Sequence, residues 1–425
     1  MNIFGRRGAC PGLSAPMLTG DGLLVRFMPT DRIGLNELHA LCAAARRHGN
    51  GTIEITARGS LQVRGLSPWS APEFAREVSN LGMAGADGIN VITDPLADNP
   101  EPIIDALAVA DEVRRALAQV RLELSAKVSV IVDGGSRLHL DQLPADIRLR
   151  AIESAQAALL HVSMGGNASS ATPLGAIVPR SAATVVIALL DAIGAHGPDA
   201  RAGDAVRREG SKSLRARIAE HLQCVPDPPP RAPAEVIGQH PLRGGSIALG
   251  VAPAFGHIHA DALAELAQAA GRYGVQFAQL APARALLLLG VAPRDATALA
   301  EEAARVGLIV SPDDPRRVIV ACPGKPDCTS GLIPARALAR ELSQHLQWPH
   351  AYAPGDGRAI VHISGCTKGC AHPSPAPLTV VGTERGCGIV HHGSARHAPS
   401  CHVDPADLTA EIKRLTAQTK ESADA

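Results

Sequence analysis

The sequence predicts a mixed α/β (α+β) fold that is built twice. A strand–helix–strand pattern at residues 22–66 returns at 246–291. Each copy is followed by a longer segment in which strands and helices alternate. A recurring pattern of this length indicates internal duplication, so we expect two related halves.

The first copy shows its elements clearly. G-L-L-V-R-F at 22–27 is an apolar run typical of a strand, and 35–49 has apolar residues at helical spacing and ends in glycine. T-I-E-I-T-A-R-G-S-L-Q-V-R-G-L at 52–66 predicts strand, turn and strand. In the second copy, the matching strand, helix and closing strands are expected at 246–251, 260–274 and 275–291.

The longer segments are expected to form α/β lobes. In the first half we predict a helix at 103–117 and a buried strand at 126–135. In the second half we predict strands at 316–322 and 358–366, each running into cysteine. V-P-D-P-P-P-R-A-P-A-E at 225–235 cannot form a helix or a central strand, so we expect an exposed, stiff linker.

Composition excludes several classes of function. Lys plus Arg and Asp plus Glu both number 41, so no overall field favours nucleic acid or an anionic membrane. Nine cysteines, an odd number in 425 residues, favour a reducing compartment over a disulfide framework. The most apolar run, 182–195, is too short to span a bilayer, and the N-terminus lacks the apolar core of a signal peptide. We therefore expect a cytoplasmic protein.

Four cysteines form the strongest functional signal. Cys322 and Cys328 have the spacing C-x5-C, and Cys366 and Cys370 have the spacing C-x3-C, all in loops rich in glycine and proline. Four thiolates can hold an iron–sulfur cluster, and glycine lets the backbone approach its sulfides. A structural zinc site and unligated thiols remain alternatives, although zinc pairs usually have shorter spacings.

A second signal is a set of cationic and amide side chains at 56–66. At a spacing of two, Arg58, Gln62 and Arg64 would share one side of an extended segment. Arginine forms bidentate pairs with carboxylates, so this face suits a ligand with several acidic groups. An exposed strand with scattered arginines is the simpler alternative. Arg284 occupies a comparable place in the second copy.

These motifs resemble a known family. C-P-G-K-P-D-C at 322–328 and G-C-T-K-G-C-A-H-P at 365–373 are similar to the 4Fe–4S signature of the sirohaem-type nitrite/sulfite reductase superfamily, and most similar to its precorrin-3B synthase branch. T-A-R-G-S-L-Q-V-R-G-L at 56–66 resembles the tetrapyrrole-carboxylate site of that superfamily. The resemblance extends over most of residues 8–400.

The resemblance implies a duplicated nitrite/sulfite reductase-like fold with two ferredoxin-like half-domains and two α/β lobes. On this reading residues 1–66 and 245–292 are the half-domains, 67–222 and 293–410 are the lobes, 223–244 is the linker and 411–425 is a tail. It also implies that the four cysteines ligate a 4Fe–4S cluster, and that Arg58, Gln62, Arg64 and Lys127 bind the substrate.

The implied reaction is oxygen-dependent hydroxylation and lactone formation on precorrin-3A in cobalamin biosynthesis. Besides the cluster, the branch implies a mononuclear non-haem iron. Electrons would come from an external reductase or ferredoxin, ultimately from NADH, because no G-x-G-x-x-G opens a helix after a strand. The alternative is a ferredoxin-dependent sulfite or nitrite reductase that carries sirohaem.

The sequence departs from the sulfite reductases at two positions. Ile89 stands where those enzymes have arginine, and Ser129 stands where they have a second lysine beyond Lys127. Two positive charges are therefore missing from the pocket that would hold a small dianion. A cysteine- and histidine-rich tract at 386–402 could bind a second metal, but its spacings fit no defined site, and a surface loop is the simpler interpretation.

Overall fold

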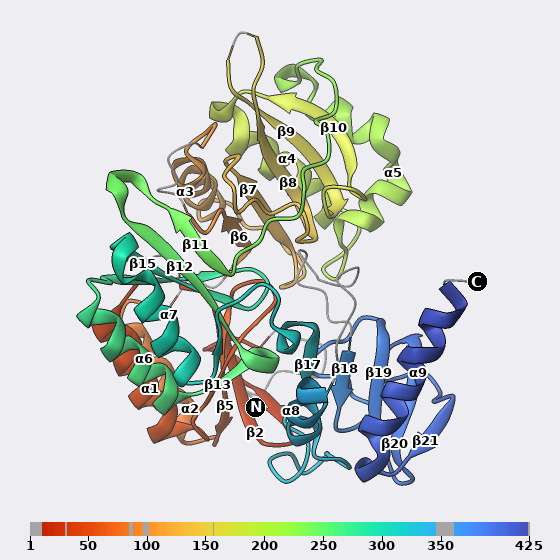
Figure 1. Ribbon diagram of the computed structural model, residues 1–425. Coiled ribbons are helices and arrows are strands. Elements are labelled where there is room, and N and C mark those ends of the chain that lie inside the picture. The colour runs from red at the N-terminus through yellow and green to blue at the C-terminus, as the bar shows by residue number, and fades with distance from the viewer. Residues whose placement is uncertain are drawn as a thin grey trace. The chain divides into compact units, whose positions relative to one another are not determined.

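The chain forms two compact units in the computed structural model (Figure 1). The structure describes residues 11–29, 32–84, 88–96, 102–155, 157–345 and 361–423. Unit 1 comprises residues 1–85, 236–240 and 247–425, and unit 2 comprises residues 86–235 and 241–246.

Unit 1 contains two half-domains of the same design, which confirms the predicted duplication. The elements of the first are β1 (Met17–Thr19), β2 (Gly22–Phe27), β3 (Ile33–Gly34), α1 (Leu35–His48), β4 (Thr52–Ile55), β5 (Leu61–Leu66) and α2 (Ser70–Asn80). The elements of the second are β11 (Gly238–Pro241), β12 (Ile247–Pro253), β13 (His257–His259), α6 (Ala260–Arg272), β14 (Phe277–Ala281), β15 (Ala285–Val291), α7 (Ala296–Arg305) and β16 (Leu308–Ile309).

Local chemistry explains where these elements begin and end. In α1, Leu38, Leu41, Cys42 and Ala45 are buried at helical spacing, and the backbone N–H of Gly49 donates to Ala45 O at 3.1 Å where the helix ends. The half-domains extend beyond 66 and 292, because α2 and α7 pack into the same core as α1 and α6.

The half-domains exchange one strand each. The first sheet has the order β1-β2-β5-β4-β13, and the second has β11-β12-β15-β14-β3. Thus β13 from the second copy pairs antiparallel with β4, while β3 from the first copy pairs antiparallel with β14. The turns of the two copies also meet, since the backbone N–H of Ala283 donates to Ala57 O at 3.0 Å.

The rest of unit 1 is a lobe at residues 315–423, here named the cysteine lobe. Its elements are β17 (Ile319–Ala321), α8 (Ala335–His345), β18 (Val361–Ser364), β19 (Ala376–Thr383), β20 (Gly386–Gly393), β21 (Cys401–Val403) and α9 (Leu408–Ala423). The strands form one sheet in chain order, with β17, β18 and β19 parallel and β20 and β21 antiparallel. Figure 1 shows α8 and α9 beside this sheet.

Unit 2 repeats the topology of the cysteine lobe. Its elements are β6 (Asn90–Thr93), α3 (Ala106–Leu117), β7 (Ser129–Asp133), β8 (Ala145–Ile152), β9 (Leu159–Gly166), β10 (Thr172–Ile177), α4 (Ala182–Gly194) and α5 (Ala202–Arg217). Again the first three strands run parallel and the last two antiparallel. The apolar face of this sheet packs with α3, α4 and α5 in one buried core.

Two expectations need correction. The strand expected at 316–322 is only β17, because Pro315 opens a 3-10 turn that continues to Val318. The linker is not a free spacer: Arg150 donates to Pro229 O at 2.8 Å, and His139 contacts Ala232 O at 2.8 Å. Positions 358–360 of the strand expected at 358–366 lie outside the described residues.

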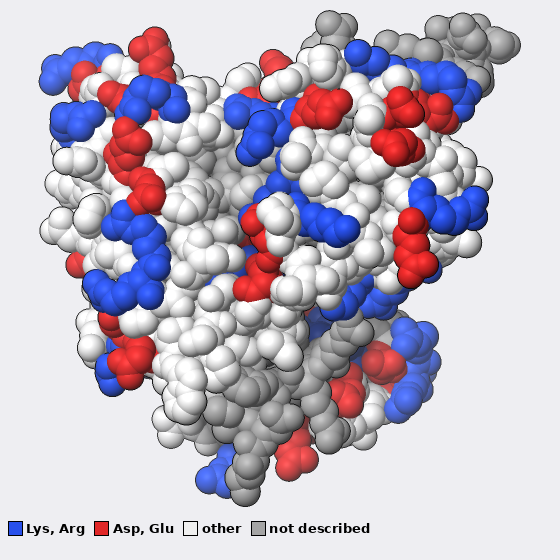
Figure 2. All heavy atoms as spheres, turned by 90° about the horizontal axis from the view of Figure 1, so that it is seen from below, with Lys and Arg blue, Asp and Glu red and all other residues white. Residues whose placement is uncertain are grey.

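Surface charge agrees with the balanced composition. On the face shown in Figure 2, basic and acidic side chains are interspersed. Within the described part of the chain, no helix combines the length and the apolar character needed to cross a membrane.

Candidate functional site

The four predicted cysteines follow two neighbouring parallel strands. Cys322 comes directly after β17, and Cys366 comes two residues after the end of β18. Because parallel strands end at the same edge of a sheet, the two loops start side by side, and the Cys322 N–H donates to Ile363 O at 3.1 Å. Within the first loop, the Cys328 N–H donates to Gly324 O at 2.8 Å.

The four thiols influence one another electrostatically. All four are free thiols. Burial raises the pKa of Cys322, and the charges of Cys370 and Cys366 raise it further. Burial also raises the pKa of Cys370, where Cys366 and Cys328 act in the same direction while Arg64 opposes them. The sequence-predicted cysteines thus lie close enough to influence one another electrostatically.

The backbone approaches two of these sulfurs closely, at Gly365 and at Gly20. The Gly365 N–H donates to Cys322 Sγ at 3.0 Å. A Cβ at Gly20, in the loop after β1, would lie 2.3 Å from Cys328 Sγ. Backbone N–H donors to sulfur and glycine at the point of closest approach are features of iron–sulfur sites.

The sulfur separation favours a cluster over zinc. A tetrahedral zinc holds four sulfurs about 3.8 Å apart, given zinc–sulfur bonds of about 2.3 Å. Among the described residues, the one group of three or more candidate ligands within 4.8 Å of one another is formed by other side chains, Asp133, His139 and Asp141. No three of the four cysteine sulfurs, all of them in the described part of the chain, lie within 4.8 Å of one another, so they are not gathered at the spacing of a tetrahedral zinc site.

Arg64 lies beside the exposed edge of the cysteine site. Its Nε is 3.0 Å from Asp21 Oδ2 and 3.4 Å from Glu54 Oε1, and its side chain is buried. Burial alone would lower the pKa of Arg64, but Glu54 and Asp21 outweigh it and raise the pKa, with smaller contributions from Cys370 and Cys322. Arg64 therefore stays charged close to Cys370, the exposed member of the four.

The other predicted binding residues are distributed differently. Gln62 is buried on β5, directly opposite Arg26 on β2 and Glu54 on β4. Arg58 lies in the turn between β4 and β5, so the expectation that it shares one extended face with Gln62 was wrong. Lys127 belongs to unit 2, where it is exposed in the turn before β7.

Sequence reasoning missed a group of cations from α8. Arg336 Nη2 is 3.6 Å from Glu54 Oε1, while its Nε and Nη2 have no hydrogen-bond partner among the described residues. His257, opposite Glu54 on β13, has its pKa lowered to about 3 by burial and by Arg336, Arg340 and Arg64. The i, i+4 spacing in A-R-A-L-A-R at 335–340 was the available signal.

The close group Asp133, His139 and Asp141 in unit 2 does not fit a bound iron. Arg231 forms ion pairs with both carboxylates, and its Nη2 is 2.6 Å from Asp141 Oδ1. The guanidinium already compensates the charge that would attract a metal ion. The 386–402 tract forms β20, β21 and their connection, and brings no three ligands within 4.8 Å of one another among the described residues.

Comparison with known proteins agrees with this architecture. The model of the family "Nitrite/Sulfite reductase ferredoxin-like half domain" matches residues 15–81 and 240–306. The chain is 36% identical to a precorrin-3B synthase from Sinorhizobium sp, over 99% of this chain and 90% of that protein. It is 23% identical to a ferredoxin–nitrite reductase from Synechococcus elongatus, over 87% of this chain and 78% of that protein.

A solved structure shares the fold. The NirA protein of Mycobacterium tuberculosis superposes with a TM-score of 0.70 at 18% identity, covering 93% of this chain and 80% of that one. The two family matches fall on the two half-domains that exchange strands.

Proposed function

The chain belongs to the precorrin-3B synthase family of the nitrite/sulfite reductase superfamily, and on that premise we propose how it converts its substrate. The reaction is the oxygen-dependent hydroxylation of precorrin-3A at a meso carbon, followed by closure of a lactone from an acetate side chain. One oxygen atom of dioxygen enters the product, and the other leaves as water after two electrons and two protons are supplied.

The observation that carries this proposal is the set of cations beside the cysteines. Arg64, Arg336 and Arg340 act on one sheet face, where His257 is held neutral. The chain has no net charge, so this is a local feature and not a general field. A tetrapyrrole with many carboxylates is the kind of ligand that such a cluster of guanidiniums selects. Gln62 and Arg58, from the same hairpin, and Lys127 of unit 2 are proposed to assist.

Cys322, Cys328, Cys366 and Cys370 would hold a 4Fe–4S cluster, which would supply one-electron transfer next to the bound ring. Arg64 keeps a positive charge beside Cys370 and so favours the more reduced, more negative state of that edge. We assign no ligands for a mononuclear non-haem iron, because Arg231 occupies the one close three-ligand group of the described residues.

The proposed partners are dioxygen and an external electron donor, a reductase or ferredoxin that draws on NADH, in the cytoplasm. The ferredoxin-dependent relative supports a protein donor. The alternative, sulfite reduction with sirohaem, is disfavoured at Ile89, which packs against the apolar core of unit 2, and at Ser129, which is buried. Neither supplies positive charge for a small dianion.

The test is turnover under isotope labelling. Protein purified without air should contain iron and acid-labile sulfide and show a broad brown absorbance. With precorrin-3A, a reductant and ¹⁸O₂, the product should gain one ¹⁸O atom. An intense Soret band together with reduction of sulfite or nitrite would instead support the sirohaem reading, and protein without iron or sulfide would refute both.

A further inference from the structure

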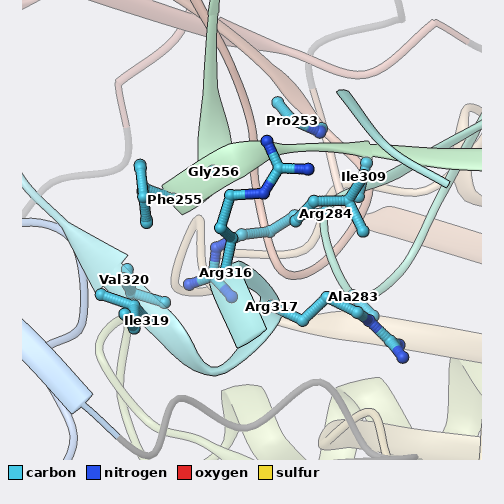
Figure 3. Close-up of a pocket in the computed structure, with 11 residues that line it drawn as sticks. Pro253, Phe255, Gly256, Ala283, Arg284, Ile309, Arg316, Arg317, Ile319 and Val320 are labelled. Carbon is cyan, nitrogen blue, oxygen red and sulfur yellow. The ribbon is translucent and has the colours of Figure 1, made fainter. Parts of the chain in front are cut away.

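A recess in unit 1 carries an arginine without a counterion. Residues from β12, β16, β17 and nearby turns, among them the turn before β15, line it (Figure 3): Phe255, Arg284, Ile309, Arg316, Ile319 and Val320 are among them. Arg316 is ion-paired with Asp314 at 2.6 Å. Arg284, in contrast, has no hydrogen bond or ion pair to any described residue, although Glu54 acts on it electrostatically.

The backbone at Arg284 is unusual. Ala283 and Arg284 adopt φ values of 61° and 64°, in the left-handed region that non-glycine residues rarely occupy. The turn is fixed by the hydrogen bond from Ala283 N–H to Ala57 O of the other half-domain. Strained backbone that the surrounding structure holds in place often marks a functional position.

A buried histidine stands next to this recess. His362 on β18 lies directly opposite Val320 of the recess in the parallel ladder. It is 0% exposed, and both of its ring nitrogens lack a hydrogen-bond partner among the described residues. Such a group is costly unless something satisfies it. His372 faces it edge-on, with ring centroids 5.7 Å apart.

The unit 2 lobe shows that the fold does not need this histidine. The strand β7 corresponds to β18, because each is the middle of three parallel strands. Ile131 takes the place of His362, because each forms the second residue pair with the next strand: Ile131 lies opposite Arg148, and His362 lies opposite Thr379. An apolar side chain is sufficient there, and it is fully buried. The polar side chain in the cysteine lobe therefore requires an explanation other than packing.

Charge decides which ligand fits. Burial, His372 and the guanidinium of Arg284 together lower the pKa of His362 to about 3, so its imidazole is neutral. A metal cation would be repelled by the buried guanidinium of Arg284, which has no ion pair among the described residues. An anion would instead gain a charge-assisted pair with Arg284 and the single N–H donor of the His362 imidazole, whose ring nitrogens have no other partner among the described residues.

We infer that Arg284 and His362, with the His372 ring packed edge-on against the imidazole, form a binding site for one carboxylate of the tetrapyrrole substrate. This inference rests on the proposed function and deepens it, because it assigns the position of one acidic side chain of the ring. It also makes Arg284 and His362 positioning residues, since a carboxylate held at a fixed point orients the whole macrocycle.

The test measures the binding of uroporphyrin III, a stable ring with eight carboxylates, through the quenching of its fluorescence as protein is added. Arg284→Gln and His362→Ile should each raise the Kd at least about tenfold, whereas Arg294→Gln, which removes an exposed arginine of the same half-domain, should leave it unchanged. Arg284→Lys should recover part of the affinity. Iron content and brown absorbance should match the wild type in all four variants.

Each contrary result has a distinct meaning. If Arg284→Gln keeps its cluster and binds uroporphyrin III as tightly as the wild type, or if the wild type does not bind it, the carboxylate site is refuted. A metal ion beyond the cluster iron that is lost in His362→Ile would also refute it. If the wild type binds the ring through Arg284 but does not convert precorrin-3A, the site stands and the proposed function fails.

Discussion

The two α/β lobes share one topology but use the same corner of the sheet for opposite purposes. In the cysteine lobe, Cys322 follows the first strand, and its sulfur accepts from the Gly365 N–H at 3.0 Å. In unit 2, Asp94 follows the first strand, and its Oδ2 accepts from the Gly134 N–H at 2.8 Å. The hydrogen bond between the strand-end side chain and the glycine is thus preserved while the acceptor changes from thiol to carboxyl.

The two lobes also differ in whether their buried polar side chains find partners within the protein. Around Asp133 and Asp141 in unit 2, Arg148, Arg150 and Arg231 supply the cations that compensate the two carboxylates. In the cysteine lobe, both ring nitrogens of His362 lack a hydrogen-bond partner among the described residues. Charges that are paired within the unit stabilise it, whereas a buried imidazole without a hydrogen bond can still bind a ligand.

The largest expected effect comes from removing a cysteine that is proposed to bind the cluster, compared with removing a cysteine of unit 2. Cys366→Ser should abolish the brown absorbance and all turnover, because three thiolates and a hydroxyl hold the cluster poorly. Cys224→Ser, at an exposed cysteine of unit 2, is the control and should keep full iron content. Iron and sulfide assays with absorption spectra measure both. Full colour in Cys366→Ser would exclude Cys366 as a ligand.

The next effect concerns the buried ion pairs of Arg231. Arg231→Leu removes the cation that pairs with both Asp133 and Asp141 and should cost about 3–5 kcal/mol of unfolding free energy. Arg207→Gln, at an exposed pair of the same unit, should cost less than about 1 kcal/mol. Denaturant unfolding gives both values. Equal losses would show that these ion pairs contribute nothing beyond surface charge.

A matched glycine pair compares the two corners directly. A Cβ at Gly134 would lie 2.5 Å from Ile104 O, so Gly134→Ala should destabilise unit 2 by about 1–3 kcal/mol and leave iron content unchanged. A Cβ at Gly365 would lie 2.9 Å from Gly324 Cα and 3.4 Å from Cys322 Sγ. Gly365→Ala should therefore displace the Cys322 loop and lower iron per chain. Normal iron in Gly365→Ala would contradict this account.

The smallest effect depends on pH. Burial, and then the charge of Asp133, raise the pKa of Asp94 well above its usual value. The folded state thus holds the Asp94 proton more tightly, and the associated stability is lost as pH rises through the raised pKa. Asp94→Asn keeps an oxygen that can accept from the Gly134 N–H. Its free energy of unfolding should therefore rise relative to that of the wild type as pH rises, by about 1.4 kcal/mol for each unit of pKa shift. Parallel stability curves from pH 5 to 9 would contradict it.

The sequence predicted local structure better than long-range polar contacts. The ranges 22–27 and 35–49 became β2 and α1 almost unchanged, because apolar periodicity and a terminal glycine mark them. Arg58 was misplaced because Gly59, at φ 78°, turns the chain where an extended run was expected. A contact such as Arg231 with Asp133 joins residues far apart in the chain, and no spacing rule indicates it.

In the candidate site, too, the sequence predicted the residues that are close in the chain and missed those that only the fold brings near. The four cysteines were found because they form two short-spaced pairs, C-x5-C and C-x3-C, that are visible in the sequence itself. His257, Arg336 and His362 reach the site from separate strands and a helix, so only the folded chain relates them. The exchange of β3 and β13 could not be predicted either, because each is a short segment of one copy that pairs in the sheet of the other copy.

That exchange has a consequence for how the molecule can be divided. A fragment that stops before β13 would leave β4 with an open edge, and one that starts after β3 would leave β14 in the same condition. Unpaired edges of this kind recruit strands from other chains. Either half expressed alone should therefore associate with itself, and co-expression of the two halves should restore a discrete heterodimer.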